Sequence, residues 1–389
     1  MLSFTNELQQ IRQAGLYRVL REACSQSGPK VNIAGREMLM MASNDYLGLC
    51  SHPRVVKKAQ QAMETWGAGS GAARLVSGNI SLFDDLEQKL AAFKETEDSL
   101  VFSTGYMANI GLLSALAGSG DVIYSDELNH ASIIDGCRLS GARIEVFPHR
   151  DAGALEDLLR KAARYRRKII ITDGVFSMDG DIAPLPLLME LANRYDAFLI
   201  VDDAHGTGVL GEQGRGTLEH LDLCANGSVA IMGTMGKAMG GFGAFVAGTS
   251  ELKQFLINRS RSFIFTTALP PSVVASAIEA LDVLQKEPER RMQLHKNHLF
   301  FRNGLKALGF NILGSTTHIV PVMVGDPETA VAMADYILGE DVFILAIRPP
   351  TVPEKSSRLR ITVMATHTRG DLEQALEVLE RAGRKFGII

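Results

Sequence analysis

Short apolar runs alternate with amphipathic stretches along most of the 389 residues. Apolar runs of strand length that end in Asp, Thr or Gly are typical of buried strands in a parallel sheet, and the stretches between them have helical spacing. The runs that predict strands are 121–127, 168–174, 198–205, 228–234 and 243–248. This alternation predicts an α/β fold built on a large, mostly parallel sheet.

A second, smaller unit is predicted after residue 275. Residues 270–287 begin with two prolines, which suit the start of a helix that leads into this unit. Its predicted strands are 318–325, 342–348 and 358–365, and its predicted helices lie near 327–339 and 370–385. The first 23 residues have the pattern of a polar amphipathic helix. The predicted parts are an N-terminal helix and arm at 1–45, a large domain at 46–275 and a small C-terminal domain at 276–389.

Composition and charge argue against several classes of protein. Hydrophobic residues make up 46% and charged residues 22%, which is ordinary for a soluble globular protein. The net charge is -4 and no basic block is present, so we expect no nucleic-acid partner. No apolar run or signal core stands out, so we expect neither a membrane span nor export. Four scattered cysteines favour a reduced, cytoplasmic location and argue against a zinc site.

Lys237 lies in the glycine-rich string GTMGKAMGG, residues 233–241. A phosphate-binding loop requires Gly, four residues and then Gly-Lys-Ser/Thr, whereas Ile231 and Ala238 occupy the first and last positions here. Two alternatives remain. Lys237 is either a surface lysine in a turn or a lysine that forms a covalent bond inside a tight pocket.

The preceding strand favours the covalent alternative. The string VDDAH places Asp202 and His205 three residues apart where a strand ends. Together with Asp203 they could bind a metal or form a satisfied polar cluster. A carboxylate, a histidine and a later lysine also suit pyridoxal 5'-phosphate, because its ring nitrogen needs an anionic partner and its aldehyde needs a lysine.

Other segments could complete such a site. STGYMAN precedes a predicted helix that begins near Tyr106, and the free N–H groups of a helix start suit a phosphate. His130 lies in a strand-to-helix loop, where it could stack on a planar ring or cap the loop. His295 and His298 share a helix face, but no third metal ligand is in view, so a solvated face is expected and no metal.

Taken in order, these motifs resemble the α-oxoamine synthases, which are fold-type-I pyridoxal-phosphate enzymes. The matching segments are SNDYLGL (43–49), GSGAARLVSGN (69–79), STGYMAN (103–109), DELNHAS (126–132), DGVFSMDGD (173–181), VDDAHGTGVLGEQGRG (201–216), GTMGKAMGG (233–241), FTTALPP (265–271), IRPPTVP (347–353) and RLRITVMATHT (358–368). The resemblance extends from about Arg18 to the end of the chain. It implies an aspartate aminotransferase-like fold, pyridoxal 5'-phosphate as cofactor and a homodimer with active sites at the interface.

The resemblance also implies a role for each matching residue. Lys237 would bond the cofactor aldehyde and then serve as acid and base. Asp202 would pair with the ring nitrogen, His205 would bond the ring phenolate oxygen, and His130 would stack on the ring and face the substrate. The other implied cofactor contacts are Gly105, Tyr106, Ser177 and Thr234, with Thr266 or Thr267 reaching the neighbouring subunit's phosphate. The implied substrate contacts are Asn44 and Arg348 for the amino-acid carboxylate, Thr351, and Arg18 for the far end of the acyl chain.

Two segments of the chain point to one branch of the family. VDDAHGTGVLGEQGRG and IRPPTVP resemble the branch that condenses L-alanine with a pimeloyl thioester, of coenzyme A or of an acyl carrier protein, in biotin biosynthesis. Ala72 and Ala73 stand where many relatives have Gly-Ser, on the implied acyl side of the pocket. The alternatives are another branch, such as one that joins glycine to acetyl-CoA, or a non-enzymatic pyridoxal-phosphate-binding regulator.

Overall fold

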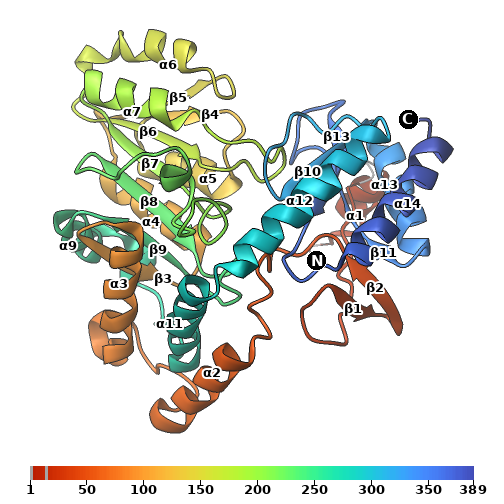
Figure 1. The fold of residues 1–389 in the computed structure, drawn as a ribbon. Helices are drawn as coiled ribbons and strands as arrows, with labels where there is room; N and C mark the ends of the chain where they lie inside the picture. The colour runs from red at the N-terminus through yellow and green to blue at the C-terminus, as the bar shows by residue number, and fades with distance from the viewer. Residues whose placement is uncertain (1–2, 14–15) are drawn as a thin grey trace.

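A seven-stranded sheet forms the larger of two lobes in this computed structural model, which describes residues 3–13 and 16–389 (Figure 1). Its strands are, in spatial order, β3 (Asp98–Phe102), β9 (Ala244–Gly248), β8 (Val229–Thr234), β7 (Phe198–Asp202), β6 (Lys168–Asp173), β4 (Val122–Asp126) and β5 (Arg143–Phe147). β9 pairs antiparallel with β3 and with β8, and the other pairs of this sheet are parallel. Each predicted run of the large domain contains one of these strands, so the predicted α/β fold is confirmed.

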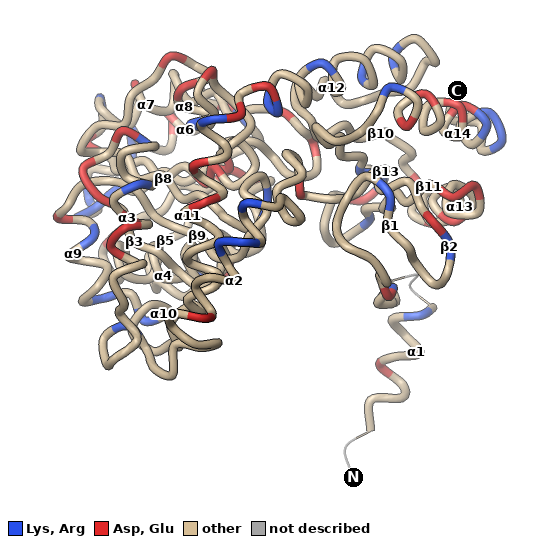
Figure 2. The backbone as a smooth tube through the Cα atoms, turned by 60° about the horizontal axis from the view of Figure 1, so that its bottom comes forward, with Lys and Arg blue, Asp and Glu red and all other residues tan. Residues whose placement is uncertain are grey.

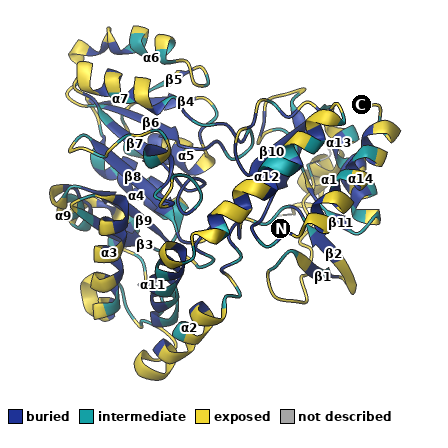
Figure 3. Cartoon of the chain, in the orientation of Figure 1, coloured by how far each residue is buried: buried dark blue, intermediate teal, exposed yellow. Residues whose placement is uncertain are grey.

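Helices cover both faces of this sheet, and the buried strands are dark in Figure 3. Because successive side chains of a strand point to opposite faces, Ile200 packs in one apolar cluster and its neighbours Leu199 and Val201 in another. The lobe's helices are α2 (Pro53–Trp66), α3 (Ser81–Lys94), α4 (Gly105–Leu116), α5 (Ala131–Ser140), α6 (Ala152–Leu159), α7 (Leu185–Arg194), α8 (Thr217–His220), α9 (Ser250–Arg259), α10 (Arg261–Ile264) and α11 (Pro271–Lys286). A π-helical turn at Arg74–Gly78 and a 3-10 turn at Ala162–Arg164 complete it.

The smaller lobe contains two three-stranded sheets. One has the order β10 (Ile319–Gly325), β13 (Ser357–Thr362), β12 (Leu345–Ile347), and the other has the order β1 (Lys30–Ile33), β2 (Arg36–Met40), β11 (Val342–Phe343). The helices are α12 (Glu289–Ala307), α13 (Pro327–Gly339) and α14 (Arg369–Lys385). The prediction of one strand over 342–348 is wrong, because the chain changes sheets at the buried Ile344. The domain boundaries at residues 45 and 275 stay a prediction.

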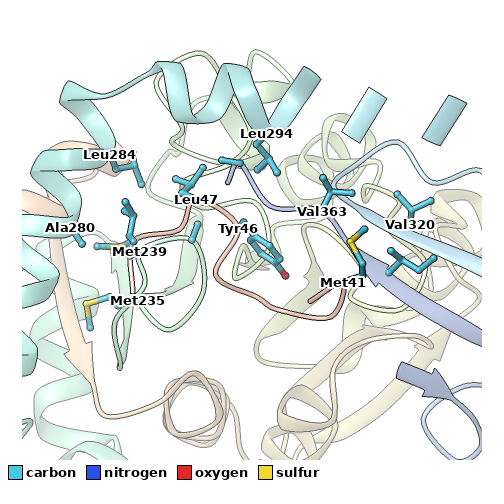
Figure 4. Packing of buried hydrophobic residues seen from close by; sticks show 14 of the residues in the cluster. Met41, Tyr46, Leu47, Met235, Met239, Ala280, Leu284, Leu294, Val320 and Val363 are labelled. Atoms are coloured by element: carbon cyan, nitrogen blue, oxygen red, sulfur yellow. The ribbon is translucent and has the colours of Figure 1, made fainter. Parts of the chain in front are cut away.

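One apolar core crosses from the larger lobe to the smaller one (Figure 4). Met239 and Leu284 come from the larger lobe, and Val320 comes from the smaller lobe. Tyr46, which has no exposed surface, lies between them in Figure 4 on the segment 41–49. This connecting segment carries functional side chains into the space where the two lobes meet.

The N-terminal helix is shorter than the predicted 23 residues. Helix α1 (Thr5–Gln13) has no buried residue and stands away from the body of the chain in Figure 2. Residues 1–2 and 14–15 lie outside the described part, so the prediction is not assessed there. Among the described residues, no helix has the length and apolar character that crossing a membrane requires.

Candidate active site

The site is built at the carboxyl ends of three neighbouring parallel strands. Asp173, Asp202 and Thr234 are the last residues of β6, β7 and β8, and Asp173 lies beside Asp202 in register. Ligands bind at such strand ends in open α/β sheets. The Thr234 hydroxyl donates to the Gly243 carbonyl at 3.0 Å and accepts from the Gly236 N–H at 3.1 Å. These bonds close the turn that presents Lys237.

Lys237, His205 and Tyr46 form a hydrogen-bonded chain. The Lys237 Nζ lies 2.9 Å from His205 Nε2, and His205 Nδ1 lies 2.7 Å from the Tyr46 hydroxyl. That hydroxyl donates to Asn44 Oδ1 at 3.0 Å, so the Nδ1–H of His205 is the donor to Tyr46. The structure therefore brings Lys237, His205 and Asn44 together.

Burial sets the charge states of this group. Desolvation lowers the pKa of Lys237 to about 8, although the charges of Asp202 and Asp173 act to raise it. Desolvation and then the charge of Lys237 hold the pKa of His205 well below its ordinary range, which leaves the imidazole neutral. Desolvation and then the charge of Asp202 hold the pKa of Asp173 well above its ordinary range. Burial beside Asp202 therefore disfavours the charged form of Asp173.

Asp202 is buried, with 3% of its surface exposed, and each of its oxygens accepts one hydrogen bond from the residues that the structure describes. Oδ1 accepts from the Ala204 N–H at 3.0 Å, and Oδ2 accepts from Asn109 Nδ2 at 2.7 Å. A carboxylate oxygen can accept two hydrogen bonds. Asp202 therefore keeps acceptor capacity for a cationic ring nitrogen.

His130 is the N-cap residue of α5 and remains exposed. Its backbone N–H donates to Asp173 Oδ2 at 2.9 Å, and its Nδ1 lies 2.8 Å from the Ser132 hydroxyl. Desolvation lowers the pKa of His130, and the charge of Lys237 acts in the same direction, against the opposing charge of Asp202. The loop therefore presents a neutral imidazole beside the carboxylate pair.

The start of α4 provides unpaired backbone donors. Thr104 caps the helix and accepts from the Met107 N–H at 3.1 Å, whereas the N–H groups of Gly105 and Tyr106 donate no hydrogen bond within the described chain. Such a helix start suits a phosphate. The Tyr106 hydroxyl is bonded to Asp135, on α5. The Thr267 carbonyl accepts from the Ser103 hydroxyl at 3.5 Å, so the Thr266–Thr267 pair lies close to this helix start within the same chain.

Arg360 joins two of the predicted contact residues. Its Nε donates to the Ser177 carbonyl at 2.6 Å, and its Nη2 donates to Asn44 Oδ1 at 3.3 Å.

The predicted substrate contacts Arg348, Arg18 and Thr351 form a separate group. Arg348 donates to the Tyr17 carbonyl at 3.2 Å, next to the exposed Arg18. Arg18, Arg348 and the exposed Thr351 have no hydrogen bond to the Lys237 group within residues 3–13 and 16–389.

Several residues of the site received no role from the sequence. Four of them are Tyr46, Asn109, Asp173 and Arg360. Each is a polar or phenolic side chain inside one of the motifs quoted above, and that position is the only sign of them in the sequence.

The expectation of a solvated face for His298 is wrong. It is buried, and desolvation lowers its pKa to about 4, while His295 is exposed. No group of three metal-ligating side chains occurs in the described residues.

Known proteins match this chain along its whole length. The aminotransferase class I and II family matches residues 36–379. An 8-amino-7-oxononanoate synthase from Geobacter sulfurreducens is 51% identical over 389 residues, covering 100% of this chain and 99% of that protein. An 8-amino-7-oxononanoate synthase from Citrifermentans bemidjiense is 48% identical, with 100% of both chains covered.

Solved structures of related enzymes also match this chain over most of its length. A serine palmitoyltransferase from S. paucimobilis, with PLP and myriocin bound, is 33% identical with a TM-score of 0.94, covering 99% of this chain and 98% of that chain. An 8-amino-7-oxononanoate synthase from Francisella tularensis is 28% identical with a TM-score of 0.79, and the match covers 90% of this chain and 99% of that chain. This chain therefore belongs to the aminotransferase class I and II family and, within it, to the α-oxoamine synthases.

Proposed function

We propose that this chain is a pyridoxal-phosphate-dependent acyltransferase that condenses L-alanine with a pimeloyl thioester. The products are 8-amino-7-oxononanoate, CO2 and the free thiol carrier, and the reaction belongs to biotin biosynthesis. The observation that carries the proposal is the half-buried Lys237, whose amine has a pKa lowered by desolvation to about 8 and feels the charge of Asp202, in a chain whose full-length relatives are named for this reaction. A neutral amine and a fixed carboxylate are what the cofactor aldehyde and ring nitrogen require.

The side chains fit this cofactor. Lys237 approaches from the turn after β8, Asp202 offers a buried carboxylate with spare acceptor capacity, and the free N–H groups of Gly105 and Tyr106 suit the phosphate. His130 supplies a neutral ring on the loop between these groups. When bound, pyridoxal phosphate supplies an electron sink for negative charge at the amino-acid Cα.

Each residue has a task that its environment supports. A Lys237 amine with a pKa of about 8 is partly neutral near pH 7.5, so its Nζ can take the Cα proton of alanine and later return one. Asp202 holds the ring-nitrogen proton in place through its negative charge. Arg348 and Asn44 would orient the alanine carboxylate, and an arginine suits this through its bidentate geometry.

A second α-oxoamine activity, that of a serine palmitoyltransferase, is favoured by one observation. The structural match to that enzyme has a TM-score of 0.94, against 0.79 for the Francisella 8-amino-7-oxononanoate synthase. Sequence identity favours the first activity, at 51% against 33%, and pocket chemistry follows side chains more closely than backbone position. A glycine-plus-acetyl-CoA activity remains the alternative within the same chemistry.

A substrate panel tests the assignment. Purified protein with pyridoxal phosphate should release thiol and CO2 fastest with L-alanine plus pimeloyl-CoA or pimeloyl acyl carrier protein. The competing pairs are serine plus palmitoyl-CoA and glycine plus acetyl-CoA. Faster turnover with either competing pair would overturn the proposal, and comparison of the two pimeloyl donors would identify the carrier.

A homodimer would complete the site. Exposed apolar side chains border it: Leu75 (53% exposed), Val76 (80%), Tyr106 (43%), Phe242 (52%) and Phe265 (71%). The segments that carry them touch, because the Ala268 N–H donates to the Ala72 carbonyl at 3.0 Å. Exposed apolar clusters of this kind mark interfaces, and a second copy would bring its own Thr266–Thr267 segment to this face. Val76→Glu should yield monomers in analytical ultracentrifugation, and a persistent dimer would contradict this interface.

A further inference from the structure

The amide of Asn109 connects two groups that lie on different elements of the candidate site. Asn109 is on α4 and has no exposed surface. Its Nδ2 donates to Asp202 Oδ2 at 2.7 Å and to the Ser132 hydroxyl oxygen at 2.9 Å. Both hydrogens of one amide nitrogen are therefore used, one on β7 and the other on α5.

The orientation of this amide is imposed by the charge of Asp202. Asn109 Oδ1 is buried and has no hydrogen-bond partner among the described residues. An unpaired buried acceptor is unfavourable, but the flipped amide would direct this oxygen at the Asp202 carboxylate. Charge-assisted bonds to a carboxylate are stronger than neutral ones, so the amide keeps its two hydrogens toward Asp202 and Ser132.

The second hydrogen determines where the proton of His130 lies. Because the Ser132 oxygen accepts from Asn109, its own hydrogen is free to reach His130 Nδ1 at 2.8 Å. The Ser132 N–H also donates to this nitrogen, at 3.2 Å. A ring nitrogen that accepts hydrogen bonds carries no proton, so a neutral His130 carries its proton on Nε2.

The two helices are built to meet at this point. A Cβ atom on Gly136 of α5 would lie 2.8 Å from Leu113 Cδ1 and 3.0 Å from the Asn109 carbonyl oxygen. Only a glycine permits this approach of α5 to α4 without a shift of the backbone. The close contact brings Ser132, one turn earlier on α5, within reach of the Asn109 amide.

We propose that Asn109 is a positioning residue that joins Asp202 and His130 into one hydrogen-bonded unit. It holds the Asp202 carboxylate in position for the ring nitrogen of the cofactor, and through Ser132 it fixes the Nε2–H tautomer of His130. The proposal rests on the proposed function only in that Asp202 and His130 face pyridoxal phosphate.

Cofactor affinity tests the first half of the proposal. Asn109→Leu removes both donors and keeps a similar volume. Spectrophotometric titration should show affinity for pyridoxal phosphate about ten- to a hundredfold weaker. Affinity for 1-deaza-pyridoxal phosphate, which has C–H in place of the ring nitrogen, should not change, because that analogue gains nothing from Asp202.

A matched variant separates positioning from packing. Asn297 is also a buried asparagine, and its Nδ2 donates to the carbonyls of Met364 at 3.0 Å and His367 at 2.8 Å in the smaller lobe. Asn297→Leu should reduce thermal stability without changing the preference for pyridoxal phosphate over its deaza analogue. An equal loss for both ligands in Asn109→Leu, or no loss for either, would overturn the proposal. Failure of the unsubstituted protein to bind pyridoxal phosphate would instead refute the proposed function.

The tautomer of His130 tests the second half and requires no variant of Asn109. Full-length protein labelled with 15N-histidine should show His130, assigned by its loss in His130→Gln, with its proton on Nε2. Long-range 1H–15N correlation spectra distinguish the two neutral tautomers, with and without pyridoxal phosphate. A proton on Nδ1 in both states would overturn the link through Ser132.

Discussion

Lys94 and Asp203 form an ion pair in which each side chain is only 1% exposed, with 2.8 Å between Nζ and Oδ2. The lysine also donates to the Thr207 hydroxyl at 2.8 Å. The other carboxylate oxygen accepts from the Thr217 N–H at 3.1 Å and from its hydroxyl at 2.8 Å. Asp203 directly follows Asp202 at the start of the loop that carries His205, and its buried carboxylate thus joins the end of α3 to the start of α8.

Lys94→Met should destabilise the protein strongly. Removing one partner of a buried pair leaves an uncompensated charge, and the expected loss is about 3–5 kcal/mol in the free energy of unfolding. Urea denaturation of the cofactor-free protein measures it. Lys89→Met is the control, because Lys89 pairs with Asp282 while 43% exposed and should contribute about 0–1 kcal/mol. Equal losses in the two variants would contradict the structural role of Lys94.

Lys237→Ala should abolish the covalent link to the cofactor and reduce turnover by at least about 10²–10⁴-fold, the usual contribution of an acid–base group. Borohydride reduction followed by peptide mass spectrometry should locate the cofactor on Lys237 in the unsubstituted protein. Lys57→Ala, at an exposed lysine of α2, should retain both the adduct and the activity. An adduct on any other lysine would refute the assignment.

The amine of Lys237 should also titrate early in the cofactor-free protein. Because desolvation lowers its pKa to about 8, modification by trinitrobenzenesulfonate should reach half its maximal rate near pH 8 at this lysine. Exposed lysines should reach it near their ordinary pKa of about 10.4. Site-resolved mass spectrometry across pH 6–11 measures both. A rate at Lys237 that follows the exposed lysines would mean that burial does not perturb this amine.

Arg18→Ala should weaken binding of the acyl thioester but not of alanine. If its guanidinium meets the distal carboxylate of a pimeloyl chain, the lost pair is worth about 1.5–3 kcal/mol, or tenfold to a hundredfold in KM. A monocarboxylic thioester of equal length should be unaffected. Arg12→Ala is the control, because Arg12 lies over the Tyr17 ring at 4.4 Å. Equal losses for both thioesters would assign Arg18 a structural role in the N-terminal arm.

His149 should make stability dependent on pH. Desolvation acts to lower the pKa of His149, but hydrogen bonds to Asp126 at 3.1 Å and Asp181 at 3.0 Å outweigh it and raise the pKa to about 9. The nearby Arg150, which pairs with Asp181 at 2.9 Å, adds an opposing positive charge. The pKa of His149 in the folded protein is above its unfolded value of about 6.5. The stabilisation by its contacts with Asp126 and Asp181 is therefore complete below pH 6.5 and disappears as the pH rises through 9.

The difference in the free energy of unfolding between the unsubstituted protein and His149→Gln isolates this effect. This difference should be about 1 kcal/mol near pH 6, after solvent screening, and should vanish near pH 9.5. The comparison also cancels the contribution of Lys237, whose lowered pKa acts in the opposite direction above pH 8. Urea midpoints at several pH values provide the measurement. A constant difference across this range would show that the His149 ring is not protonated.

Local patterns predicted five of the seven strands of the larger sheet and the residues that end them, whereas β3 and β5 were not predicted. Asp202 and Lys237 stood out because a carboxylate that ends an apolar run and a lysine between glycines are visible within a few residues. The partners of these groups were not visible, since Tyr46 and Asn109 are 159 and 93 positions away from their partners, His205 and Asp202. Which faces are buried depends on tertiary packing, and for that reason the exposure of His298 was predicted wrongly.

The segment 41–49 has a further consequence for how the protein unfolds. Met41 and Tyr46 have no exposed surface, and Leu47 and Leu49 belong to the same core cluster, which contains residues of both lobes. Neither lobe can lose its packing without exposing apolar surface that the other lobe shares. Two lobes that look separable in outline should therefore unfold in a single cooperative transition, with the segment 41–49 acting as a structural member of both.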